Sequence, residues 1–154
     1  MKPLVSQILE TKGHNIWSTS PQASVYDALK MMADKGVGAL IVMEGDKIVG
    51  MFSERDYARK VVLQGRWSKE TPVADVMTKA VCCVPPWRTL DECMALMTAK
   101  HVRHLPVLEG SKLVGLISIG DVVNAIISEQ EFAIQQLEAF VDEALKGRKN
   151  PDQP

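Results

Sequence analysis

The sequence predicts an α+β fold in which two copies of one β-α-β-β-α unit pack about a pseudo-twofold axis, followed by a C-terminal helix. The first observation is a repeat: residues 25–62 align without a gap on residues 90–127, at a constant offset of 65, with twelve of 38 pairs identical. The second is that both copies show helical and strand-like apolar spacing in the same order. Because a small sheet with helices on one side leaves its other face apolar, we expect each copy to cover the other.

Each copy opens with a short apolar segment, and the two segments correspond at an offset of 68 instead of 65. A strand is expected next, over residues 16–19 in the first copy and 81–84 in the second. The corresponding apolar positions of the opening segments are Val5, Ile8 and Leu9 in the first copy and Val73, Val76 and Met77 in the second.

The main helix of each copy carries apolar residues at i, i+3, i+4 and i+7, which places them on one helical face. Ser24 precedes the first helix and Thr89 the second, and an acidic residue, Asp27 or Glu92, follows three positions later. This spacing is typical of a capping box at a helix start. The two faces are Val25, Ala28, Leu29 and Met32, and Leu90, Cys93, Met94 and Met97.

Two apolar segments rich in branched residues follow each main helix, separated by Gly-Asp at 45–46 and by Gly-Ser at 110–111. Two-residue connections of this kind predict β-hairpins. Ser53 and Ser118 then stand where a further helix should begin.

The expected organisation is repeat 1 over residues 5–64, a polar linker over 65–72, repeat 2 over 73–128, an amphipathic helix over 129–147 and a disordered tail over 148–154. The amphipathic helix is a candidate dimer or docking surface, because Phe132 and Phe140 have no obvious partners in the repeats. Its apolar face holds Ala133, Leu137, Phe140, Val141 and Ala144.

Composition narrows the function classes. The 154 residues are 46% hydrophobic and 24% charged, with 18 Lys and Arg against 19 Asp and Glu, which is typical of a soluble globular protein. A net charge of -1 disfavours nucleic acid as a partner, and no apolar run is long enough to predict a membrane span. Cys82, Cys83 and Cys93 lack disulfide or zinc spacing, so we expect a reducing, cytoplasmic location.

Polar residues recur where packing does not demand them: both 50–56 and 115–121 read Gly, two apolar residues, Ser, two variable residues, Asp. A structural interpretation is sufficient, because Ser-x-x-Asp is itself a capping box. A functional interpretation uses the same geometry. A helix start attracts phosphate, and a fixed carboxylate can accept hydrogen bonds from both hydroxyls of a ribose.

The doubled helix, hairpin and Gly-x-x-Ser-x-x-Asp ending resemble tandem cystathionine-beta-synthase (CBS) domains, the pair called a Bateman module, over roughly residues 5–128. The resemblance implies a regulatory module that binds AMP, ADP, ATP or NAD(H), forms a homodimer and modulates an unidentified protein. It further implies that Asp56 and Asp121, with Ser53 and Ser118, bind ribose. The adenine would be lined by Val37, Gly38, Ala39, Leu40, Ile41, Leu105 and Pro106.

Phosphate charge must be met by basic groups, since the carboxylates repel it. We expect Arg55, Arg59, Arg103 and His104 in this role, whereas Lys60 and Arg66 are interpreted as a solvated helix face. The copies differ: Ile41 stands opposite Pro106, and Gly120 opposite Arg55. Two unequal sites are therefore expected.

Catalysis is not expected. His101-x-x-His104 lacks a further ligand at suitable spacing for a metal, and vicinal Cys82-Cys83 is only a weak redox candidate. No nucleophile motif, phosphate-binding glycine loop or dinucleotide turn is present, so no metal or catalytic cofactor is expected. The alternative to a nucleotide sensor is a structural, dimerising interaction protein without a ligand.

Overall fold

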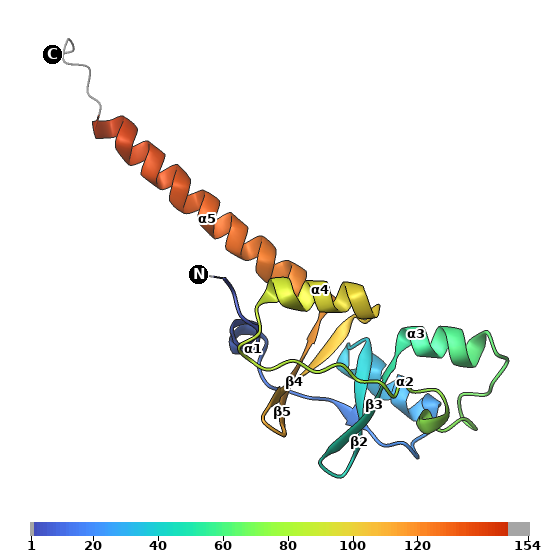
Figure 1. Cartoon of the computed structure of the whole chain (residues 1–154). Coiled ribbons are helices and arrows are strands. Elements are labelled where there is room, and N and C mark those ends of the chain that lie inside the picture. Colours follow the sequence, from blue (N-terminus) through green and yellow to red (C-terminus); the bar gives the residue numbers. More distant parts are fainter. Residues whose placement is uncertain (1, 148–154) are drawn as a thin grey trace.

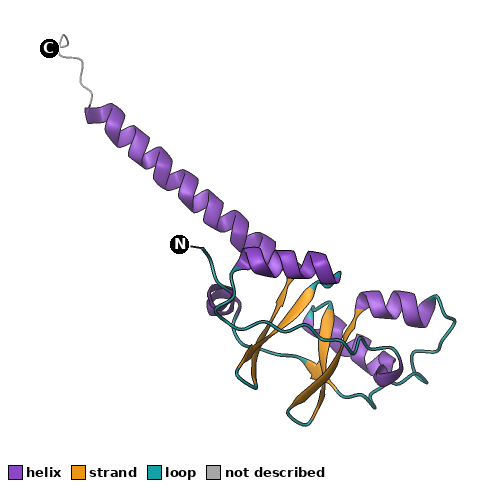
Figure 2. Ribbon diagram, in the orientation of Figure 1, coloured by secondary structure: helices purple, strands orange, loops and turns teal. Residues whose placement is uncertain are grey.

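A computed structural model describes residues 2–147 and contains two small α+β bodies side by side, with one long helix leading away from them (Figure 1). The mixed architecture agrees with the α+β class expected from the repeat. Strands of the two bodies lie next to each other in the middle, and helices cover the outside (Figure 2).

The first sheet has three strands, β1 (Ser18–Thr19), β2 (Ala39–Glu44) and β3 (Lys47–Ser53), in the order β1-β2-β3. β1 is parallel to β2, and β3 is antiparallel to it. Gly45, at φ 63, supplies the left-handed backbone of the hairpin turn. The expected hairpin is therefore confirmed.

The second sheet has two strands, β4 (His104–Glu109) and β5 (Lys112–Ser118), which pair antiparallel in the same register. The strand expected over 81–84 is not formed; a single parallel bridge joins Val84 to Val107. This prediction was wrong: two prolines follow the segment, and only Val84 bonds to the neighbouring strand, with its N–H donating to the Pro106 carbonyl and its carbonyl accepting from the Leu108 N–H.

The main helices are α2 (Val25–Lys35) and α4 (Leu90–Lys100), and both expected caps are present. Ser24 accepts from the Asp27 N–H, and Thr89 accepts from the Glu92 N–H. After β3 comes the short helix α3 (Glu54–Asp56), which continues as a π-helical stretch, η1 (Tyr57–Val62). π-Helical turns widen a helix and occur often at functional sites.

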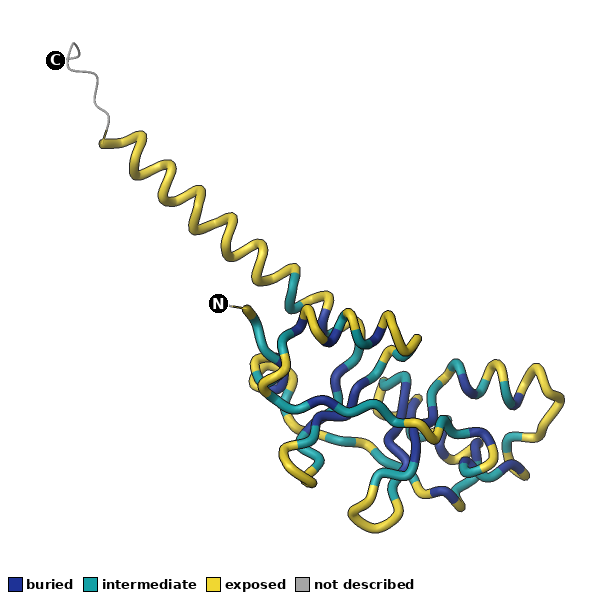
Figure 3. The backbone as a smooth tube through the Cα atoms, in the orientation of Figure 1, coloured by how far each residue is buried: buried dark blue, intermediate teal, exposed yellow. Residues whose placement is uncertain are grey.

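The opening segments of the two repeats are exchanged in space. The helix α1 (Val5–Lys12) buries Val5, Ile8 and Leu9 in the core of the second repeat, against Leu105 and Ile117. The 3₁₀ turn η2 (Val73–Asp75) packs instead with the core of the first repeat. A third core joins the two sheets through Ala39, Ile41 and Met51, with Leu113 and Leu116 packed against them. The two repeats thus pack together through this third cluster, and buried residues occur in both of them (Figure 3).

The last helix, α5 (Ile119–Gly147), runs without a break across the expected boundary at 128 and 129. The helix expected over 129–147 is thus the C-terminal part of α5, continuous with the final helix of repeat 2. Only Val122 of α5 is buried, and the helix extends into solvent beyond the body (Figure 3). The tail expected over 148–154 lies outside the described residues.

Candidate functional site between the repeats

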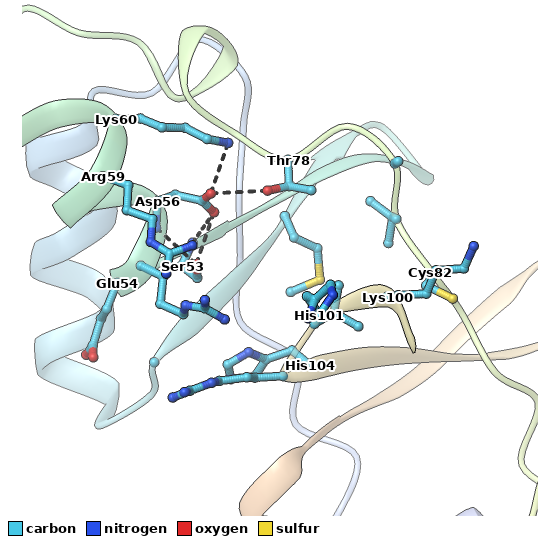
Figure 4. Close-up of a pocket in the computed structure, with 17 residues that line it drawn as sticks. Ser53, Glu54, Asp56, Arg59, Lys60, Thr78, Cys82, Lys100, His101 and His104 are labelled. Atoms are coloured by element: carbon cyan, nitrogen blue, oxygen red, sulfur yellow. Dashed lines mark hydrogen bonds and ion pairs between the residues drawn. The ribbon is translucent and has the colours of Figure 1, made fainter. Parts of the chain in front are cut away.

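A cavity of about 420 Å³ opens between the two repeats. One wall is the end of β3 with α3 and η1, and the opposite wall is the end of α4 with the start of β4. The segment that includes Thr78, Val81 and Cys82 lines the cavity between them (Figure 4). The cleft is therefore built from both copies of the repeat.

Asp56 is the most constrained acid of this cleft, with 12% of its side chain exposed. Its Oδ2 accepts hydrogen bonds from the N–H and the Oγ of Ser53, both at 3.0 Å, while the Asp56 N–H donates to Ser53 Oγ at 3.3 Å. Its Oδ1 accepts from Thr78 Oγ1 at 3.1 Å and pairs with Lys60 Nζ at 3.0 Å (Figure 4). The capping box thus holds the carboxylate at the cleft in one orientation.

Basic side chains dominate the cleft. Five of its residues are lysine or arginine and two are acidic, which leaves an excess of three positive charges before the histidines are counted. The cations come from both repeats, so an anion in the cleft would meet positive charge from two sides. The five are Arg55, Arg59, Lys60, Lys100 and Arg103, and the two acids are Glu54 and Asp56.

Two histidines complete the second-repeat wall. Burial, together with the charges of Lys12 and Arg103, holds the pKa of His104 below its ordinary value, while Asp121 opposes this shift. The ring is therefore neutral near pH 7. His101 ends α4 with φ 54, the single non-glycine residue at positive φ among the described residues. Repeat 1 places Gly36 at this position.

The second Ser-x-x-Asp motif lies elsewhere. The Ser118 N–H donates to Asp121 Oδ2 at 2.8 Å, and the Asp121 N–H donates to Ser118 Oγ at 3.1 Å. Lys12 Nζ, at the end of α1, pairs with the same carboxylate at 2.6 Å and also donates to the Leu116 carbonyl at 2.9 Å. Burial alone would raise the pKa of Asp121, but the hydrogen bonds from Lys12 and Ser118 outweigh it, so the pKa lies below its ordinary value.

The surroundings of Asp121 lack the basic set of the first cleft. Asp121 borders a groove of about 570 Å³ between α1 and α5, in which Glu129 is a second acid. At the offset of 65, only one of the five cleft cations has a basic counterpart, Lys35. The other four counterparts are Gly120, Asn124, Ala125 and Gly38.

The structure brings together one half of the predicted site. Ser53, Asp56, Arg55, Arg59, Arg103, His104 and Gly38 all line the same cleft. Ser118 and Asp121 lie apart from it, at the start of α5.

Most of the residues expected to line adenine are placed differently. Leu40 and Leu105 have 0% exposure inside the cores of repeats 1 and 2, and Ala39 and Ile41 lie in the core between the sheets. Pro106 is buried and Val37 packs against the core of repeat 1. Their side chains therefore offer no lining here, because strand alternation directs them into one core or another. Gly38, which precedes β2, remains at the cleft.

Sequence reasoning missed several cleft residues: Lys60, Thr78, Cys82, Lys100 and His101 line the cavity. Lys60 was interpreted as a solvated residue, yet it pairs with Asp56 and donates to the Val76 carbonyl at 3.2 Å. Its spacing from Asp56 by one helical turn was an available signal. The exchange of opening segments, which brings Thr78 to Asp56, has no signal in a single sequence.

No metal-binding cluster of three or more His, Cys, Asp or Glu side chains occurs among residues 2–147. None of the described helices is long and apolar enough to cross a membrane.

A pair of matched repeats that share a core and enclose a cleft defines a tandem-module protein. The profile of the CBS domain matches residues 5–63 and 73–128. The chain belongs to the CBS-domain family, and it contains two such domains. Pairs of this kind are generally regulatory and not catalytic.

Two CBS domain-containing proteins match most of the chain. The chain is 38% identical to the mitochondrial CBS domain-containing protein CBSX3 of Arabidopsis thaliana, over 89% of this chain and 71% of that protein. It is 31% identical to YhcV of Bacillus subtilis, over 81% of this chain and 89% of that protein.

Solved structures show the same fold. A CBS-domain protein of Burkholderia ambifaria, named for a role in signal transduction, superimposes with a TM-score of 0.79 at 55% identity, over 82% of this chain and 96% of that chain. A hexameric CBS-CP12 protein from bloom-forming cyanobacteria gives a TM-score of 0.73 at 26% identity, over 99% of this chain and 88% of that chain.

Proposed function

We propose that the cleft at Asp56 binds an adenine nucleotide and that the chain is a regulatory module which transmits nucleotide level to a partner protein. The observation that carries the proposal is the placement of one constrained carboxylate and five basic side chains around a single cavity between the repeats. The carboxylate suits the hydroxyls of a ribose, and the basic groups suit its phosphates.

The residues of the first-repeat wall have separate roles in this proposal. Asp56, fixed by Ser53 and Thr78, accepts hydrogen bonds from ribose hydroxyls, which take the place of the Lys60 contact on Oδ1. Arg55 and Arg59 extend from the same helix and meet the phosphate.

Regulation follows from linkage. A ligand that touches both repeats favours whichever relative arrangement binds it more tightly, and it shifts the protein only by that difference in affinity. A partner that recognises one arrangement would then respond to nucleotide concentration.

Isothermal titration calorimetry of the full chain with AMP, ADP, ATP and NADH tests the proposal. We expect one site per chain, and Asp56→Asn should weaken binding by at least about tenfold, since charge-assisted hydrogen bonds contribute about 1.5–3 kcal/mol. Asp121→Asn is the matched control and should change affinity by less than about twofold. Thermal melts of both variants report whether the caps still form.

Absence of heat and of any thermal upshift with all four compounds would exclude the nucleotide-binding function. Loss of binding in Asp121→Asn, with binding retained in Asp56→Asn, would show that the site is assigned to the wrong repeat.

A second candidate, a dimerising interaction protein, is favoured by α5. Ile127, Ile134 and Val141 recur every seven residues, with Leu137 and Ala144 at the positions between, which is a coiled-coil pattern. Ile134 and Leu137 are 55% and 64% exposed. Branched residues at the first position with leucine at the second favour a parallel two-stranded coil, so the proposed occupant is α5 of a second copy.

Sedimentation equilibrium tests this homodimer. Ile134→Glu should yield monomers, whereas the matched control Gln135→Glu, which adds the same charge one position away, should remain dimeric. Dimers that persist in Ile134→Glu would show that α5 is not the contact.

A further inference from the structure

We infer that the cleft selects a nucleotide with at least two linked phosphates, ADP or ATP over AMP, because the second repeat supplies a separate set of basic groups for the outer phosphates. The inference rests on the proposed function and specifies the ligand of that same site.

The charge of the cleft exceeds what a monophosphate needs. The negative charge of Asp56, which pairs with Lys60 at 3.0 Å in the ligand-free structure, balances one of the five cations whether or not that contact is kept. Four cations then remain against Glu54, whose side chain points away from the Asp56 carboxylate (Figure 4). A single phosphate carries about 1.5–2 negative charges at pH 7, and each linked phosphate adds more. A diphosphate or triphosphate therefore matches the remaining cations better than a monophosphate does.

The positions of the cations also favour a nucleotide with two or more phosphates. Arg55 lies on α3 next to Asp56, and Arg59 follows on η1, so both are within reach of the phosphate next to the ribose. Lys100 and Arg103 line the cleft from the second repeat. The side chain of Lys100 lies beside Cys82, on the far side of the cleft from Asp56 (Figure 4). A phosphate chain anchored by its ribose at Asp56 can reach this second group only by extending away from the first. A monophosphate would engage one wall, and a longer chain would engage both.

His101 is an independent observation on the second wall. Its φ of 54 lies in the left-handed region, which glycine adopts without strain, and the equivalent residue of repeat 1 is Gly36 at φ 65. A helix end that keeps a strained residue in place of glycine gives up stability. The ring of His101 lines the cleft beside Lys100 and Arg103. Its retention indicates that the side chain contributes to the site.

The experiment compares affinities for AMP, ADP and ATP without magnesium at fixed ionic strength, in the full chain and in three variants. We expect ATP to bind at least about tenfold more tightly than AMP. Lys100→Ala should lower ATP affinity several-fold and leave AMP affinity unchanged. Lys35→Ala, the equivalent helix-end lysine of repeat 1, is the matched control and should alter neither.

His101→Gly supplies a readout that a structural role would not give. Glycine relaxes the backbone at positive φ, so the melting temperature without ligand should rise by about 2–4 °C. ATP affinity should fall at the same time, with AMP affinity unchanged. A variant that is more stable and binds ATP more weakly identifies His101 as a ligand-contacting residue.

Three results would overturn the inference while leaving the proposed function intact: equal affinity for AMP and ATP, equal losses for both ligands in Lys100→Ala, or unchanged ATP affinity in both second-repeat variants. Absence of binding by all three nucleotides would instead remove the proposed function and this inference together.

Discussion

The two Ser-x-x-Asp motifs have the same local structure and different surroundings. In both, the serine N–H donates to the aspartate, and the aspartate N–H donates back to the serine hydroxyl. Around Asp56 lie five lysines and arginines of a shared cleft, whereas Asp121 is paired with Lys12 of α1. The cap is common to both repeats because it stabilises a helix start in each. The ligand chemistry depends on residues outside the capping serine and aspartate.

The difference shows which part of a duplicated unit can diverge. Val42 and Val107, or Leu40 and Leu105, are held by packing in equivalent cores. Arg59 and its counterpart Asn124 are both exposed, and nothing in the fold requires either. A charge can be gained or lost there without a cost in packing.

The largest expected effect is on ATP affinity, and it comes from a charge reversal in repeat 1 that is compared with the same acid at the equivalent position of repeat 2. Arg59→Glu should weaken ATP binding by about 100-fold, because it removes a cation and adds an anion at the cleft. Asn124→Glu introduces the same acid at the equivalent position of repeat 2 and should change affinity by less than about threefold. Calorimetry measures both. Similar losses in the two variants would mean that the repeats do not differ in the way described.

The next effect concerns two glycines that allow close packing. A Cβ on Gly50 would lie 2.6 Å from Met77 Sδ and 3.0 Å from the backbone carbonyl of Thr78, while one on Gly115 would meet only the side chain of Leu9. Gly50→Ala should therefore cost about 2–3 kcal/mol of unfolding free energy and Gly115→Ala about 1 kcal/mol, because a side chain can move and a backbone cannot.

Chemical denaturation measures these two costs. Gly50→Ala should also weaken nucleotide binding, since displaced Thr78 no longer donates to Asp56. A larger cost for Gly115→Ala would contradict the comparison.

The smallest effect is on Lys12. Lys12→Met should lower the free energy of unfolding by only about 0.5–1 kcal/mol, because the ion pair with Asp121 is partly exposed and is screened by salt. Lys30→Met, at an exposed position of α2, should be neutral. Melting temperatures at pH 7 report both.

Low pH should remove the difference in melting temperature between the unmutated protein and Lys12→Met. The pKa of Asp121 is lowered in the folded protein, so its contribution to stability is present above its unfolded pKa and is lost as pH falls through the folded one. The melting temperatures of the unmutated protein and Lys12→Met should therefore converge as the pH falls below about 4. A difference that persists at pH 2 would show that Lys12 acts by packing alone.

Much of the fold was predictable because short-range sequence signals specify its elements, and these signals occur in both repeats. The main helices, their caps at Ser24 and Thr89 and both hairpin turns follow from spacing within a few residues. The placement of α1 in the core of repeat 2 was not predictable, because it depends on contacts between residues far apart in the chain, such as Leu9 and Gly115.

The sequence indicated the basic residues near Asp56, but it did not indicate which residues of the other repeat would line the same cleft. Arg55 and Arg59 bracket Asp56 in sequence, so their approach follows from helical geometry. Lys100 and His101 reach the same cavity from another repeat, which sequence spacing does not encode. The adenine lining stays a prediction. Strand alternation places Leu40 and Ile41 on opposite faces of β2, but the sequence did not show that each face would pack into a different core.

The exchange of opening segments constrains how such a protein could arise. A fragment that ends in the linker would carry α1 without the core it fills, and would lack the segment that fills its own core. An ancestor with one unit could have completed its interior only by trading leading segments with an identical molecule. Gene duplication would then have converted a contact between two polypeptides into one within a single polypeptide, freeing each half to acquire its own chemistry.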